Sequence, residues 1–200
     1  FRPDPDTGDE YDRSRVRDDF VAMAAHGINT VRTYTVPPVW LLDEAVDAGL
    51  RVLVGLPWEQ HIAFLEDSQR ARDIELRVRQ LVRGCAGHPA VLAYAIGNEI
   101  PSSIVRWYGA PRVEWFLSRL FEAVKREDPT SLVTYVNYPT TEYLDLPWLD
   151  FVSFNVYLES TEALDSYAAR LQNIAGDRPL VLAEIGFDSV RHGEDQQAAM

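Results

Sequence analysis

Two glutamates in this sequence each follow a short apolar stretch. Residues 91–97 (VLAYAIG) run directly into Asn98 and Glu99, and residues 180–183 (LVLA) run into Glu184. Such stretches are too short for a buried helix and are typical of central parallel strands that are covered on both faces. Each glutamate would then lie at the carboxyl end of a strand, at one rim of the same sheet. Two carboxylates in that arrangement suit the cleavage of a glycosidic bond, with one as nucleophile and the other as acid and base.

The strands and helices that would position these side chains alternate along the chain. Apolar stretches predict six strands, at residues 28–35, 51–58, 91–97, 132–138, 151–157 and 180–185. Helical spacing of apolar side chains predicts helices at residues 39–48, 68–86, 112–127 and 161–174. Another helix precedes the first strand, with Ser14 as its expected N-cap and Gly27 after its end. Alternation without hairpin signals predicts an α/β fold with a parallel sheet and helices outside it.

Six parallel strands fit either an open doubly wound sheet or most of an eight-fold barrel. The open sheet usually carries a Gly-rich turn for a nucleotide, and neither GxGxxG nor GxxxxGK is present. An enzyme barrel instead gathers polar and aromatic side chains at the carboxyl ends of its strands. Such candidates for substrate contact lie at or near the carboxyl end of each predicted strand: Arg32 and Tyr34, Trp58 and Glu59, Asn98 and Glu99, Asn137 and Tyr138, Asn155 and Tyr157, and Glu184. We therefore predict a (β/α)8 TIM barrel.

The barrel prediction also fixes the expected places of the two glutamates. Such barrels typically have about 250 residues, so residues 1–200 are expected to form a single domain that lacks the first and last strands and belongs to a longer protein. The stretch at 91–97 would be strand four and that at 180–185 strand seven, on opposite sides of the barrel mouth. Side chains reaching inward from there can meet the separation of about 5 to 5.5 Å that retention of configuration requires.

Composition narrows the classes of partner. The chain is 46% hydrophobic and 25% charged, as in ordinary soluble globular domains, and no apolar stretch approaches the roughly 20 residues of a membrane span. The formal net charge of -12 argues against a nucleic-acid surface and suits a neutral ligand such as a sugar. The single cysteine, Cys85, excludes an intrachain disulfide framework and is expected to be a small apolar filler on a helix. No signal segment is visible, so the compartment stays open.

Neither a metal nor a cofactor is expected. His61, His192 and Glu59 lack the HxH or HExxH spacing that would support a metal site. The predicted strands also carry no lysine, which counts against Schiff-base chemistry of the lyase or aldolase type. The chemistry is therefore expected to rest on the carboxylates themselves.

The candidate residues have expected roles and ordinary structural alternatives. Arg32, by its charge, and Tyr157, by a hydrogen bond, would keep Glu184 ionised as the nucleophile. Tyr34 and Trp58 offer flat faces of the kind that stack on sugar rings. As alternatives, a single glutamate past a strand is more often a surface residue, an arginine is often a plain ion-pair partner, and strand aromatics more often fill the core.

Five motifs resemble those of the clan A glycosidases, whose (β/α)8 barrels include family 2 β-glucuronidases and β-galactosidases, family 5 cellulases and family 17 β-1,3-glucanases. The motifs are GINTVRTY (27–34), GHPAVLAYAIGNE (87–99), DPTSLVTY (128–135), DFVSFNVY (150–157) and RPLVLAEIG (178–186). The resemblance implies Glu99 as acid/base, Glu184 as nucleophile and Asn98 on the sugar 2-hydroxyl. It also implies that Arg32 and Tyr157 support the nucleophile.

The resemblance and the residues together predict a retaining glycosidase or transglycosylase for β-linked glucan or a related polysaccharide. The chain is also similar to β-glucanase-like barrels attached to membrane glycosyltransferases, which makes a glycosyltransferase an expected partner. Asn155 stands where the strand-six motif of family 5 has a histidine. Two alternatives remain, a carbohydrate-binding barrel without activity and a barrel enzyme of another chemistry.

Overall fold

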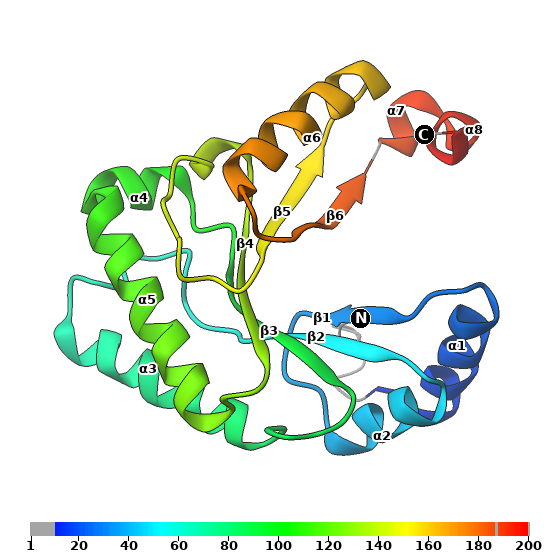
Figure 1. Cartoon of the computed structure of the whole chain (residues 1–200), viewed down its shortest axis with the longest axis horizontal. Helices are drawn as coiled ribbons and strands as arrows, with labels where there is room; N and C mark the ends of the chain where they lie inside the picture. The colour runs from blue at the N-terminus through cyan, green and yellow to red at the C-terminus, as the bar shows by residue number, and fades with distance from the viewer. Residues whose placement is uncertain (1–10, 187, 200) are drawn as a thin grey trace.

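The computed structural model describes residues 11–186 and 188–199, and its strands form one six-stranded sheet (Figure 1). Neighbouring strands are parallel and follow one another in chain order. The strands are β1 (Thr30–Thr33), β2 (Arg51–Gly55), β3 (Val91–Asn98), β4 (Leu132–Asn137), β5 (Val152–Tyr157) and β6 (Leu180–Gly186). The six predicted strands are confirmed, but β2 ends at Gly55 and leaves Trp58 in the loop that follows.

Helices connect the strands on the outside of the sheet. The long helices are α1 (Arg13–Ala25), α2 (Val39–Asp47), α3 (Ser68–Arg83), α5 (Ala110–Glu127) and α6 (Thr161–Ala175). The short helical segments are α4 (Ser102–Tyr108), η1 (Pro139–Thr141), α7 (Ser189–His192) and α8 (Glu194–Ala199). The five predicted helices are present, but the expected N-cap of α1 was wrong. Asp12 is the cap rather than Ser14, because its carboxylate accepts the N–H groups of Ser14 and Arg15.

The sheet curls into a nearly closed barrel, which confirms the predicted (β/α)8 architecture (Figure 1). Within the described residues, β1 and β6 are the two edge strands of this sheet. A side-chain bridge joins them, since Arg32 Nη1 on β1 lies 2.7 Å from Glu184 Oε1 on β6. The parallel strands therefore bring their carboxyl ends to one rim, where residues from distant parts of the sequence meet.

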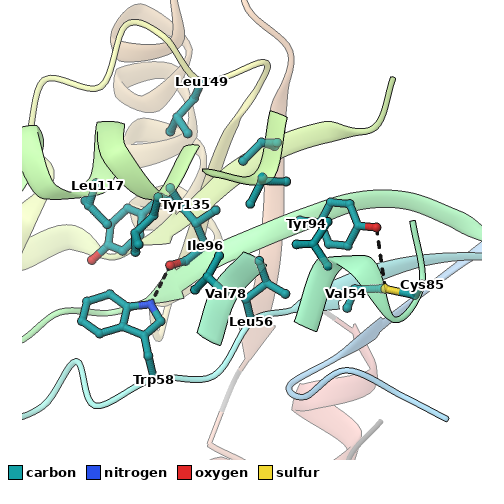
Figure 2. Packing of buried hydrophobic residues seen from close by; sticks show 14 of the residues in the cluster. Val54, Leu56, Trp58, Val78, Cys85, Tyr94, Ile96, Leu117, Tyr135 and Leu149 are labelled. Carbon is teal, nitrogen blue, oxygen red and sulfur yellow. Dashed lines mark hydrogen bonds between the residues drawn. The ribbon is translucent and has the colours of Figure 1, made fainter. Parts of the chain in front are cut away.

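Alternate faces of the strands build two parts of the core. On β3, Tyr94 and Ile96 pack outward among the side chains of the helices (Figure 2). Ala93 and Ala95 belong to a separate cluster that fills the narrow interior of the barrel. Cys85 was expected on a helix, but it lies just past the end of α3. It is buried beside the Tyr94 hydroxyl and acts as the expected small filler. Burial raises the pKa of its thiol. No helix in the described part of the chain is long and apolar enough to cross a bilayer.

Candidate active site

Glu184 lies on β6, and its carboxylate accepts three hydrogen bonds. Arg32 Nη1 and the Tyr34 hydroxyl donate to Oε1 over 2.7 and 2.8 Å, and the Tyr157 hydroxyl donates to Oε2. Burial by itself raises the pKa of Glu184, but the bonds from Tyr157 and Tyr34 and the charge of Arg32 outweigh it, so the pKa is lowered. The hydrogen bond between Tyr157 and Glu184 raises the pKa of Tyr157 to about 12. Glu184 is thus held ionised while the phenol beside it keeps its proton.

Glu99 follows β3 and accepts a hydrogen bond from a neutral group. Asn155 Nδ2 lies 2.7 Å from Glu99 Oε1 and 3.2 Å from Asn98 Oδ1. Arg32 Nη2 donates to the same Asn98 oxygen over 2.6 Å. A continuous chain of hydrogen bonds therefore joins Glu99 to Glu184 through Asn155, Asn98 and Arg32. The two carboxylates belong to one site.

The network also sets what the site presents to a ligand. Because Asn98 Oδ1 accepts two donors, its Nδ2 is the end of the amide that can donate to a ligand. Tyr34 and Tyr157 are 42% and 59% exposed, so they are aromatic rings that a sugar can reach. The Arg32 guanidinium lies over the Tyr34 ring at 4.6 Å from its centroid, which fixes the orientation of that ring.

Trp58 lies in the core, contrary to the sugar-stacking role expected for it. It is 8% exposed, and its ring meets those of Phe64 and Phe116 edge-on at centroid separations of 4.9 and 5.6 Å. Its indole N–H donates to the Ile96 carbonyl over 2.7 Å (Figure 2). Because β2 ends at Gly55, the alternation of a strand no longer decides where Trp58 points.

Three more of the predicted site residues hold the surrounding loops instead of joining the network. Glu59 forms an ion pair with Arg77 of α3, with Arg77 Nη1 at 2.9 Å from Glu59 Oε1. Asn137 Oδ1 accepts a bond from the Thr141 hydroxyl over 2.6 Å and so fixes η1. The Tyr138 hydroxyl accepts the first N–H of α4 over 3.0 Å. These contacts are structural and lie outside the chain of bonds between the two glutamates.

Gln60 was not among the predicted site residues, although it contacts the network directly. Its Oε1 accepts the backbone N–H of Asn98 over 2.7 Å. A signal existed in the sequence, because Gln60 comes shortly after the predicted strand at residues 51–58, as Glu99 comes shortly after its own. The pattern gave no reason to choose Gln60 over Glu59 beside it, since the loop conformation decides which of the two turns inward.

The chemistry available to the site comes from carboxylates, amides, phenols and one guanidinium. Within the described residues, no group of three or more His, Cys, Asp or Glu side chains could hold a metal ion. One carboxylate carries strong donors and the other a single neutral donor. Such a pair can divide the roles of nucleophile and proton donor between its members.

Comparisons with known proteins find a family model and several solved structures. Residues 3–198 match the model of the glycosyl hydrolases family 2, TIM barrel domain. No curated protein matches the chain at a significant level.

The similar solved structures include bacterial β-glucuronidases. β-Glucuronidase 2 of Bacteroides uniformis, covalently bound to cyclophellitol-6-carboxylate aziridine, has a TM-score of 0.77 and 20% identity over 93% of this chain and 24% of that one. The β-D-glucuronidase of Dictyoglomus thermophilum has a TM-score of 0.72 and 21% identity over 88% and 33%. That of Ruminococcus gnavus with D-glucuronic acid has a TM-score of 0.73 and 18% identity over 92% and 33%. These likenesses concern the fold, and the chain spans 24% to 33% of the length of these three proteins.

Proposed function

The chain belongs to the TIM-barrel domain of glycosyl hydrolase family 2, and from this premise we propose that it cleaves β-glycosidic bonds with retention of configuration. One observation carries the proposal, the unequal surroundings of the two carboxylates in one site. Glu184 accepts bonds from a guanidinium and two phenols, whereas Glu99 accepts one from the neutral amide of Asn155. Surroundings that differ in this way separate a nucleophile from an acid/base.

The proposed reaction proceeds in two displacements. Glu184 attacks the anomeric carbon while Glu99 gives its proton to the departing glycosidic oxygen, which leaves a glycosyl ester on Glu184. Glu99 then takes a proton from water as the water oxygen displaces Glu184. A sugar hydroxyl in place of water would make the same site a transglycosylase. The Nδ2 of Asn98 would donate to the 2-hydroxyl, because Arg32 and Asn155 occupy the oxygen of that amide.

We further propose that the substrate is a β-linked glucan or a related neutral polysaccharide. The cation of the network, Arg32, bonds to Glu184 and Asn98, so its guanidinium is committed to the catalytic residues. The carboxylate of a uronic acid would require another cation. The net charge of -12 also disfavours an anionic polymer. The resemblance to barrels attached to glycosyltransferases makes an enzyme that supplies nascent glucan the proposed partner.

A β-glucuronide is the second candidate substrate. It is favoured by the structural neighbours, which are β-glucuronidases, one of them covalently bound to a cyclitol aziridine with a 6-carboxylate. Hydrolysis of matched aryl β-glucosides and β-glucuronides separates the two candidates directly. We expect the glucoside to be cleaved faster.

The test of the mechanism compares substitutions of the two glutamates. Glu184→Ala should lower turnover of every substrate by at least about a thousandfold, because no nucleophile remains. Glu99→Ala should lower turnover of β-gluco-oligosaccharides by about 10²–10⁴-fold but spare an aryl glycoside with a good leaving group, which needs no proton. NMR of the first product should show the β-anomer. A gluco-configured cyclophellitol aziridine should label Glu184, as located by peptide mass spectrometry.

Glu142 provides a matched control. Its carboxylate also accepts a hydrogen bond from a phenol, the Tyr167 hydroxyl at 2.8 Å, and forms an ion pair with Arg170. Glu142 nevertheless lies outside the network. Glu142→Gln should retain full turnover. Equal residual rates for Glu184→Ala and Glu99→Ala on the activated aryl glycoside would contradict the assigned roles. Glycan binding without turnover, unchanged in Glu184→Gln, would indicate an inactive sugar-binding barrel instead.

A further inference from the structure

The backbone at Glu99 has an unusual conformation. Among the described residues, Glu99 is the non-glycine residue with a positive φ, at 53°. L-residues with a side chain avoid this left-handed region, and a residue held there needs support from its surroundings. The conformation decides where the Glu99 carboxyl points, so whatever maintains it also maintains the direction of that carboxyl group.

Three acceptors from two other parts of the barrel hold this turn. The successive N–H groups of residues 98–100 donate to Gln60 Oε1 over 2.7 Å, to the Val136 carbonyl over 2.9 Å and to the Tyr135 hydroxyl over 2.8 Å. Gln60 comes from the loop after β2, and the other two acceptors come from β4. Every N–H of the turn is therefore bonded, with side chains at its two ends and backbone in the middle.

The sequence of β3 is shaped to let these two side chains approach. A Cβ at Gly97 would lie 3.0 Å from Gln60 Oε1 and 3.2 Å from the Tyr135 ring, so a larger residue would push both away. The pairing of β3 with β4 also shifts between Ala95 and Asn98, which places an extra residue in β3 just before the turn. Such bulges redirect side chains next to active sites. Tyr135 itself is 1% exposed and is fixed by the core around it (Figure 2).

We propose that Gln60 and Tyr135 are positioning residues that keep the turn at Glu99 left-handed and so aim its carboxyl group at the glycosidic oxygen. The inference rests on the proposed function, in which Glu99 is the acid/base. Neither residue is assigned contact with the substrate. Both act through the backbone N–H groups on the two sides of Glu99.

The proposal makes the cost of losing either acceptor depend on the leaving group. Cleavage of an alkyl or sugar leaving group needs the proton of Glu99, and a misdirected acid slows it. Cleavage of an aryl glycoside with a strongly acidic phenol does not need that proton. A defect in general stability would slow both reactions alike. The ratio of the two rates therefore separates positioning from a merely structural role.

The experiment measures this ratio on the full chain with Tyr135→Phe and Gln60→Met, each of which removes one acceptor at nearly constant shape. Each change should shift the ratio about tenfold against the poor leaving group, the scale of one hydrogen bond. Gln60→Glu, which keeps an acceptor oxygen, should restore much of the loss. Tyr94→Phe is the matched control, because Tyr94 is equally buried and donates to Asp128 over 3.0 Å, away from the turn. It should leave the ratio unchanged.

Hydrogen exchange makes the test independent of activity. The amides of residues 98–100 should exchange faster in Tyr135→Phe and Gln60→Met than in the unchanged chain or in Tyr94→Phe. An unchanged leaving-group ratio together with unchanged exchange would overturn the positioning role while leaving the proposed function intact. If the two variants exchange faster but the unchanged chain hydrolyses no glycoside, the result would support the positioning of the turn and reject the proposed function.

Discussion

At the scale of single residues, the surroundings of Glu184 account for its assignment as the ionised carboxylate. Burial opposes ionisation, while two phenols and one guanidinium favour it. Arg32 contributes both its charge and a hydrogen bond, whereas Tyr34 and Tyr157 contribute hydrogen bonds to the charged form. Removing a phenol should therefore change the acidity of Glu184 without removing the cation that neutralises it.

The predicted consequence is a pH shift in Tyr157→Phe. Loss of this bond raises the pKa of Glu184 toward its usual range, because the bond stabilises the ionised form. The proposed nucleophile works only when ionised, so the acidic limb of the kcat/KM profile should move to higher pH. The rate at neutral pH should also fall by about tenfold, because the hydrogen bond that orients the carboxylate is lost. Profiles measured with an activated aryl glycoside, which isolates Glu184 from Glu99, test this expectation.

An exposed tyrosine outside the network provides the control for this shift. Tyr143 is 53% exposed, and Tyr143→Phe should leave the profile in place. If Tyr157→Phe moved the acidic limb to lower pH, or left it unmoved, the hydrogen bond would not be what keeps Glu184 ionised.

The success of sequence reasoning at the residue scale depended on how far each strand extends. Arg32 and Asn155 lie on strands, where alternation decides which side chains point inward, and both reach the network. Trp58 and Gln60 lie past the end of β2, in a loop. Alternation says nothing there, so the sequence predicted a sugar contact for Trp58 and overlooked Gln60. Only the fold shows that Trp58 turns outward into the core and that Gln60 turns inward to Asn98.

At the scale of elements, charged side chains clamp neighbouring helices. Glu127 near the end of α5 accepts bonds from Arg79 Nε over 2.6 Å and from Arg83 Nη2 over 3.0 Å, both on α3. The hydrogen bonds from Arg83 and Arg79 lower the pKa of Glu127 to about 2. Because the pKa in the folded state lies below the usual value of 4.5, this clamp stabilises the fold above pH 4.5 and loses its effect as the pH falls toward 2.

We accordingly predict that Glu127→Gln lowers the melting temperature at pH 7 by about 1–4 °C, and that the difference narrows as the pH approaches 3. Thermal unfolding followed by circular dichroism across this pH range measures the effect. Glu122→Gln is the control, because Glu122 is exposed on the same helix. A difference that stayed constant down to pH 3 would show that the ion pairs with Arg79 and Arg83 are not its source.

Of the elements that the sequence did not predict, α4 depends on a tertiary contact. α4 has seven residues, too few for a clear helical period, and its first N–H is bonded to the Tyr138 hydroxyl from another part of the barrel. The long helices carry several turns of apolar spacing and were expected from the sequence. α5 nevertheless begins at Ala110, two residues before the predicted start at residue 112.

At the scale of the whole molecule, curvature creates the site. Alternation of strands and helices predicts a parallel sheet but does not say whether the sheet curls into a barrel. The barrel was predicted because polar and aromatic residues lie near the carboxyl end of every predicted strand. The structure shows that this choice was correct, since Arg32 and Glu184 come from opposite edges of the sheet and bond to each other. The two carboxylates therefore depend on the curvature of the sheet for their common site.

The overall charge of the chain leads to a prediction about how salt affects its reaction with acidic sugars. A net charge of -12 repels anions at long range, and salt screens this repulsion, with a Debye length of about 10 Å at 0.1 M. Labelling of Glu184 by cyclophellitol-6-carboxylate aziridine should therefore quicken about two- to threefold as ionic strength rises from 0.01 to about 0.15 M. Labelling by the neutral gluco-configured aziridine should stay constant, which makes the two reagents controls for each other. Equal responses to salt would show that the field of the protein does not select against acidic sugars, and the argument for a neutral glucan would then lose its support from charge.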